Sequence, residues 1–263
     1  MKNKPRDRAA NRASSPTRGD VASEVADALL KAARELCAAL RPLRFGAPVT
    51  HVYNPLEYAW EAHAAYVRRF ATGQRRVVFL GMNPGPFGMT QTGVPFGEVE
   101  AVSGWMGIHA AVSRPIAEHA RRPIEGFECR RSEVSGRRLW GWAAERFGPP
   151  EAFFSDCFVV NYCPLLFLEE SGRNRTPDKI PAAEMDPVTR ACDAHLAQVL
   201  QWLQPDWVLG VGGYAESRLR LVAPSSVRTA RIGSILHPSP ASPAANRGWA
   251  AAVDRQLAEM GVF

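Results

Sequence analysis

Four short apolar runs, each separated from the next by a helical pattern, most strongly limit what this chain can fold into. They span residues 76–81, 156–160, 207–211 and 231–236. Nearly continuous apolar runs of this length are typical of strands buried on both faces. Strands that alternate with helices form parallel sheets, because each parallel connection needs a crossover. We therefore predict an α/β fold with three layers, α/β/α, around a central, mostly parallel four-stranded sheet.

Apolar residues at helical spacing fill the segments around these runs. We expect helices at residues 21–40, 55–70, 136–146, 187–203, 214–221 and 246–260. Sheets of this kind bind ligands beyond the carboxyl ends of their strands. Three of the four predicted strands end in an unusual polar motif, so we expect the functional site at that edge.

Charge is distributed unevenly along the 263 residues. The formal net charge is +6, and residues 1–20 hold six basic and two acidic side chains, a net +4. We predict a basic disordered tail over residues 1–20, either a loose tether for DNA or merely a solubilising segment, followed by a single domain over residues 21–263. No apolar stretch is long enough to span a membrane, so we expect a soluble protein without membrane association.

The cysteine pattern argues against disulfides and metal centres. The five cysteines are scattered and contain no CxxC pair: Cys37, Cys129, Cys157, Cys163 and Cys192. Structural zinc sites and disulfide frameworks need closer and paired spacings. We expect free thiols, no metal and no cofactor.

The first predicted strand leads into a loop with the sequence GMNPGPFGMTQTGVPFG at residues 81–97, which holds five glycines and three prolines. Such a composition predicts a rigid loop that comes close to its ligand. The loop lacks both common phosphate-binding patterns, GxxxxGK[ST] and GxGxxG. The second predicted strand ends in NYCPL at residues 161–165, and the fourth ends in HPSP at residues 237–240.

These three motifs resemble those of the single-strand-selective monofunctional uracil-DNA glycosylases, within the uracil-DNA glycosylase superfamily. Three further segments share the resemblance: YNPLEYAW at residues 53–60, ECRRSEVSG at 128–136 and SGRN at 171–174. The resemblance implies a uracil-DNA glycosylase-like fold. It also implies a monofunctional enzyme of base excision repair that hydrolyses the N-glycosidic bond of uracil and 5-hydroxymethyluracil and leaves an abasic site. The partners would be single- and double-stranded DNA carrying uracil or an oxidised pyrimidine.

Glycosidic cleavage builds positive charge on the deoxyribose and negative charge on the departing base. The resemblance implies that Asn83 positions the attacking water, and that His237 donates an N–H to O2 of the leaving uracil. From the residues alone, the favoured interpretation of Asn83 beside a proline is a turn residue, and that of His237 before a proline is the end of a strand. A neutral imidazole suffices for the donation.

Four other residues are expected to recognise the base. Phe96 would stack on the flipped base, although it is nearly as well explained as a core aromatic. Asn161 can accept from uracil N3–H and donate to O4, and a rotated amide would suit cytosine equally, so its neighbours must fix its orientation. Met82 and Gly85 resemble the pocket wall near uracil C5, where a glycine leaves room for a 5-hydroxymethyl group.

The segment from residue 238 to 248 resembles a DNA-intercalating wedge that fills the gap left by the flipped nucleotide. We expect its DNA-binding residues to be Pro238, Ser239, Pro240, Ala241, Ser242, Asn246, Arg247 and Gly248. Many relatives carry Arg-Asn where this chain has Ala241-Ser242. The motifs contain no lysine, so Schiff-base lyase chemistry lacks its nucleophile.

Two other functions compete with the glycosylase. One is a nucleotide-binding or sugar-phosphate-binding α/β enzyme that uses the glycine loop. The other is a non-catalytic DNA-lesion-binding protein, which the presence of both Asn83 and His237 disfavours. We expect a monomer in the cytoplasm, associated with the nucleoid, if the source is bacterial, and in the nucleus if it is eukaryotic.

Overall fold

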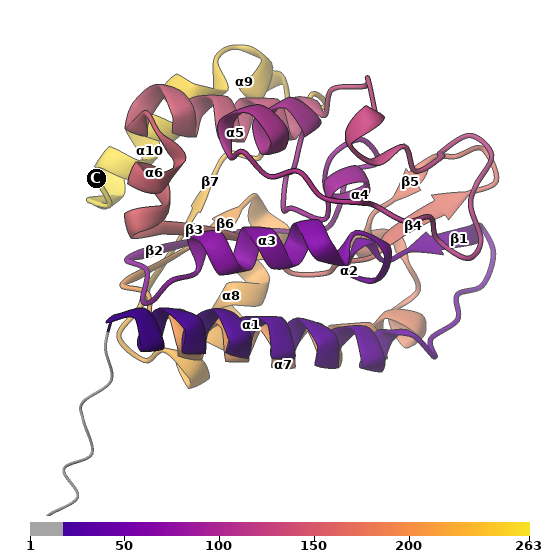
Figure 1. Ribbon diagram of the computed structural model, residues 1–263, viewed down its shortest axis with the longest axis horizontal. Coiled ribbons are helices and arrows are strands. Elements are labelled where there is room, and N and C mark those ends of the chain that lie inside the picture. Colours follow the sequence, from indigo (N-terminus) through magenta and orange to yellow (C-terminus); the bar gives the residue numbers. More distant parts are fainter. Residues whose placement is uncertain (1–17) are drawn as a thin grey trace, which may run out of the picture.

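The computed structural model describes residues 18–263 and contains the expected central sheet (Figure 1). Its four strands are β2 (Val77–Gly81), β3 (Cys157–Asn161), β6 (Trp207–Val211) and β7 (Arg231–Ile235). They pair in the order β3-β2-β6-β7, and every neighbouring pair is parallel. The predicted sheet is confirmed, and all of its strands run the same way.

Helices cover both faces of this sheet (Figure 1). One face carries α5 (Val134–Phe147), α6 (Pro150–Asp156) and α10 (Trp249–Met260). The other carries α1 (Arg18–Leu40), α3 (Trp60–Phe70), α7 (Ala182–Leu203) and α8 (Gly213–Ser226), with α1 packed along α7. The three-layer α/β/α architecture is therefore confirmed. Among the helices of residues 18–263, none combines the length and the apolar character needed to cross a membrane.

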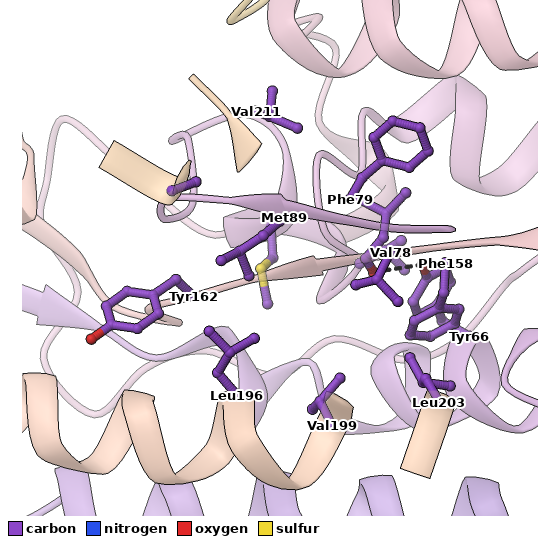
Figure 2. Close-up of a cluster of buried hydrophobic side chains, with 14 of the residues drawn as sticks. Tyr66, Val78, Phe79, Met89, Phe158, Tyr162, Leu196, Val199, Leu203 and Val211 are labelled. Carbon is purple, nitrogen blue, oxygen red and sulfur yellow. Dashed lines mark hydrogen bonds between the residues drawn. The ribbon is translucent and has the colours of Figure 1, made fainter. Parts of the chain in front are cut away.

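The core follows from the alternation of side chains along the strands. Phe79 of β2 packs against Trp142 of α5 and Phe153 of α6. On the opposite face, Phe158 of β3 stacks on Tyr66 of α3 with ring centroids 5.1 Å apart. Figure 2 shows this second cluster reaching down to α7. All five cysteines are free and buried, as expected.

A second, smaller sheet was not predicted. It consists of β1 (Val49–Tyr53), β4 (Leu166–Glu169) and β5 (Asn174–Arg175), paired antiparallel in the order β1-β4-β5. These strands are short, and β1 finds its partner more than a hundred residues away. Local sequence patterns carry no information about such pairing.

Several helix boundaries also differ from expectation. The predicted helix at 55–70 is two helices, α2 (Pro55–Tyr58) and α3, and the one at 246–260 is α9 (Pro243–Asn246) and α10. Unpredicted short elements are α4 (Met89–Thr92), α6, a π turn at Ala101–Trp105 and 3-10 turns at Gly126–Glu128 and Pro177–Lys179. Helix α7 begins five residues before the predicted start at Pro187, and α8 runs five residues beyond its predicted end. Helix α1 starts within the predicted tail, whose residues 1–17 lie outside the described part of the chain.

Candidate active site

The carboxyl ends of the four parallel strands meet at one edge of the sheet. Gly81, the last residue of β2, is paired with Asn161, the last residue of β3. The ladder continues beyond the strands, because the N–H of Tyr162 donates to the carbonyl of Gly81 at 2.9 Å. At the other side of the edge, the N–H of Gly212 donates to the carbonyl of Ile235 at 2.9 Å. These bonds hold the three motif loops next to one another.

Gly81 lies where the side chains of Asn161 and Phe96 meet, and this place is called the slot. A methyl group on Gly81 would overlap Oδ1 of Asn161 and lie 2.5 Å from Cε2 of Phe96. The rings of Phe96 and His237 are neighbours, with centroids 6.4 Å apart and planes inclined by 47°. The structure therefore brings together an aromatic ring, an amide and an imidazole, which the sequence places on three separate loops.

Phe96 is held in a strained backbone conformation. Its φ is +53°, in the left-handed region that residues other than glycine rarely adopt. Its carbonyl accepts from the N–H of Glu98 at 2.8 Å and from Nε1 of Trp140 at 3.1 Å. Helix α5 comes this close because Gly136 has no side chain, and a methyl group there would overlap the Phe96 carbonyl. Strain that surrounding contacts enforce in this way is concentrated at functional sites.

The hydrogen bonds of His237 identify its tautomer. Nδ1 lies 3.0 Å from the N–H of Ser239, a group that can only donate. Nδ1 therefore carries the lone pair, and in the neutral ring the proton sits on Nε2. Burial lowers the pKa of His237 below its ordinary value, which keeps the ring neutral. Gly212, with φ +91°, leaves space for the ring, since a methyl group there would lie 3.2 Å from Cβ of His237.

The side chain of Asn83 is hydrogen-bonded to the chain next to the small sheet. Its Nδ2 donates to the carbonyl of Leu165 at 3.2 Å, just before β4 begins. This contact uses the donor end of the amide and leaves the acceptor, Oδ1, facing elsewhere. An oxygen oriented in this way can accept a hydrogen bond from a water molecule and hold it in place.

The expected pocket wall is organised differently from the prediction. Met82 is half-buried, and its carbonyl accepts from the N–H of Cys163 at 2.9 Å. The space beside Gly85, expected to be open, is filled by the carboxyl group of Glu133, whose Cδ would lie 2.7 Å from a methyl group on that glycine. Oε2 of Glu133 accepts from the N–H of Phe87 at 3.2 Å. Burial raises the pKa of Glu133 despite this bond.

The predicted wedge forms a compact turn after β7. Pro240, Ala241, Asn246, Arg247 and Gly248 are exposed, whereas Ser239 and Ser242 are half-buried. The turn is closed by Ser242 N–H to Ser239 O at 3.0 Å and by Asn246 Nδ2 to Pro240 O at 2.9 Å. Pro238 is buried, unlike the tip of the turn, and its contact with DNA stays a prediction.

Arg138 of α5 stabilises this turn through three hydrogen bonds. Its Nη1 donates to the carbonyls of Pro238 at 3.0 Å and Ser239 at 3.3 Å, and its Nη2 donates to Oδ1 of Asn246 at 2.8 Å. All three acceptors are uncharged, so the guanidinium keeps its positive charge at the surface that carries the exposed turn.

Comparison with known proteins agrees with this geometry. The model of the uracil DNA glycosylase superfamily matches residues 68–257. The single-strand selective monofunctional uracil DNA glycosylase of Bos taurus is 48% identical over 239 residues, covering 91% of this chain and 88% of that protein. The corresponding protein of Rattus norvegicus is 48% identical over 242 residues, covering 92% and 87%. The chain belongs to the single-strand-selective monofunctional uracil-DNA glycosylases.

A solved structure confirms the glycosylase fold. SMUG2 from Pedobacter heparinus superposes with a TM-score of 0.67 at 20% identity, over 90% of this chain and 97% of that one. At this identity the likeness concerns the fold alone. It spans both the parallel sheet and the flanking helices, so the uracil-DNA glycosylase-like architecture expected from the motifs is confirmed.

Sequence reasoning did not find the residues of this glycosylase that support the site. Gly81 and Gly212 stand directly at strand ends, a position that could have singled them out. The side chains of Trp140, Arg138 and Glu133 lie on or beside α5, distant in sequence from the loops that they support. Among residues 18–263, no group of three or more His, Cys, Asp or Glu side chains is placed to hold a metal ion.

Proposed function

We propose that this protein is a monofunctional DNA glycosylase that removes uracil from DNA by hydrolysis of the N-glycosidic bond. The observation that carries the proposal is the slot over Gly81, where Phe96, Asn161 and a neutral His237 converge. A flipped base needs a stacking surface, an edge reader and a donor for its developing charge, and this slot offers one of each.

His237 acts on the leaving group. As the C1′–N1 bond breaks, its electron pair moves onto uracil, and negative charge grows on O2. Nε2–H of the neutral imidazole stabilises this charge as a hydrogen-bond donor, while Ser239 fixes the tautomer from the other side of the ring. Protonation on Nδ1 would set two donors against each other, so the neutral ring is the active form.

Asn83 acts on the nucleophile. The sugar develops oxocarbenium character, so the water needs orientation more than deprotonation. Oδ1 of Asn83 accepts from this water, because Nδ2 is engaged by Leu165. The water oxygen then bonds to C1′, and the proton that it loses passes to solvent or to the departing uracil anion.

Two substitutions test these roles. Asn83→Ala and His237→Ala should each reduce single-turnover uracil excision by about 10²-fold or more, since a positioned catalytic donor contributes that much. Binding to uracil-containing DNA should stay close to wild type, because both groups act in the transition state. Wild-type excision by both variants would refute the assignment.

The finer substrate range is also a proposal. Excision of 5-hydroxymethyluracil follows from the family resemblance alone, because the carboxyl group of Glu133 fills the space beside Gly85. Oligonucleotides that carry a single uracil, 5-hydroxymethyluracil, hypoxanthine or thymine, treated with enzyme and then alkali, test it directly. Strand cleavage at uracil but not at 5-hydroxymethyluracil would limit the range to uracil.

The wedge, residues 238–248, is proposed to occupy the gap left by the flipped nucleotide in double-stranded DNA. Its exposed tip and the charge on Arg138 support this placement. We propose that residues 21–263 act as one monomeric domain on single- and double-stranded DNA, and that the protein acts where that DNA lies, in the nucleoid or the nucleus. Sedimentation of the free protein and its DNA complex tests the monomer.

A further inference from the structure

The amide of Asn161 has one protein partner, and it is a sulfur atom. Nδ2 lies 3.2 Å from Sδ of Met89, within a buried part of the site. Oδ1 is buried and has no hydrogen-bond partner among the described residues. It lies close to Gly81, beside the Phe96 ring. The amide thus directs its donor at the sulfur and leaves a buried acceptor without a partner next to the aromatic ring.

A thioether can hold an amide in only one of its two orientations. The sulfur carries lone pairs and no hydrogen, so it accepts from Nδ2 but has nothing to donate to Oδ1. Rotating the Asn161 amide by half a turn would lose this bond and set the amide oxygen against the sulfur lone pairs. It would also present the NH2 group to N3 of the base, the arrangement that suits cytosine.

We propose that Met89 fixes the orientation of the Asn161 amide and thereby directs this enzyme to uracil rather than cytosine. The inference rests on the proposed uracil excision and adds its specificity determinant. In the fixed orientation, Oδ1 accepts from N3–H of uracil, whereas cytosine would present an N3 lone pair to the same oxygen. Met89 is a positioning residue, because it acts through Asn161.

The surroundings of Met89 suit this role. It begins α4 and is 3% exposed, so its side chain is packed rather than free to swing away. The next residue anchors the turn, because Oγ1 of Thr90 donates to the carbonyl of Gly85 at 2.7 Å. Figure 2 shows the Met89 sulfur between the strands and α7. The sulfur is therefore held by the same loop that supplies the pocket wall.

Met89→Leu tests the proposal, because leucine preserves volume and apolar character but removes the acceptor. Single-turnover rates are measured on two single-stranded oligonucleotides that differ only in carrying uracil or cytosine at the target position. The ratio of the uracil rate to the cytosine rate should fall roughly five- to tenfold, as expected from loss of one weak hydrogen bond. Met106→Leu, the same change at a fully buried core position, should leave the ratio unchanged.

A purely structural role for Met89 would lower both rates together and leave their ratio at the wild-type value, which would overturn the proposal. Met89→Gln provides a second variant of similar length. Its amide can accept from Nδ2 or donate to Oδ1, so the ratio should fall again. In an Asn161→Ala background, Met89→Leu should produce no further change in the ratio, and a full change there would also refute the inference. Absence of uracil release by the wild-type protein would instead refute the proposed function.

Discussion

Replacing Gly81 by alanine should close the base slot while leaving the fold intact. The added methyl group would overlap Oδ1 of Asn161 and lie 2.5 Å from Cε2 of Phe96. Carbon atoms pack no closer than about 3.5 Å without repulsion, so the ring would have to retreat by about 1 Å. The carbonyl of Phe96 is held by Trp140 and Glu98, and these bonds oppose that movement.

The expected loss follows from this displacement. Misplacing groups around a reacting base by about 1 Å can cost 10²-fold in rate, and here both the stacking ring and the edge-reading amide are displaced. Overpacking a buried position destabilises a protein by about 1–3 kcal/mol, which lowers the melting temperature without unfolding the protein. We therefore expect Gly81→Ala to lose about 10²-fold in uracil excision and to melt a few degrees below wild type.

The assay is single-turnover excision from a single-stranded oligonucleotide with one uracil, enzyme in excess, followed by alkaline cleavage. Gly213→Ala is the matched control at the neighbouring strand end, because a methyl group there meets nothing within 4 Å. The control should excise at the wild-type rate. Excision by Gly81→Ala within roughly threefold of wild type would show that the slot is not where the base binds.

Three further predictions concern the wedge and the buried histidines. Arg138→Met keeps the aliphatic stem but removes three hydrogen bonds, so binding of double-stranded uracil DNA, measured by fluorescence anisotropy, should weaken about tenfold and that of single-stranded DNA much less. Ala241→Arg should tighten binding of double-stranded substrate and abasic product at fixed salt, and equal gains on single strands would mean that the arginine acts only as charge. Burial lowers the pKa values of His63 and His195 to about 4. Between about pH 6.5 and 4 the unfolded chain therefore binds more protons than the folded protein. As the pH is lowered through this window, the free energy of unfolding should fall by on the order of 2 kcal/mol per histidine. The fall should be smaller in His195→Met than in the wild type.

The sequence was sufficient to predict the sheet and the edge at which the motif residues meet. Buried parallel strands are apolar along their whole length, so β2, β3, β6 and β7 could be placed within a residue or two. The resemblance to the uracil-DNA glycosylases implied one site for Phe96, Asn161 and His237, and the shared edge of the parallel strands explains why their loops meet.

The residues that support the slot could not be found in this way. Glu133 and Trp140 reach loops that lie some forty residues earlier in the chain, and no periodicity encodes such a contact. Gly85 also shows what cannot be predicted from the sequence. Its missing side chain was interpreted as room for a substrate, whereas the carboxyl group of Glu133 fills that space. A glycine in a sequence indicates that another group comes close to the backbone, but it does not identify that group.

One helix, α5, contacts two functional loops at three points. At its start Glu133 binds the N–H of Phe87, in its second turn Arg138 binds the wedge, and Trp140 binds the carbonyl of Phe96. A helix is stiff over this length, so a shift of one loop is transmitted to the other. A displacement of the wedge would therefore also move Phe96, so the proposed contact with duplex DNA and the proposed stacking on the base are coupled through α5.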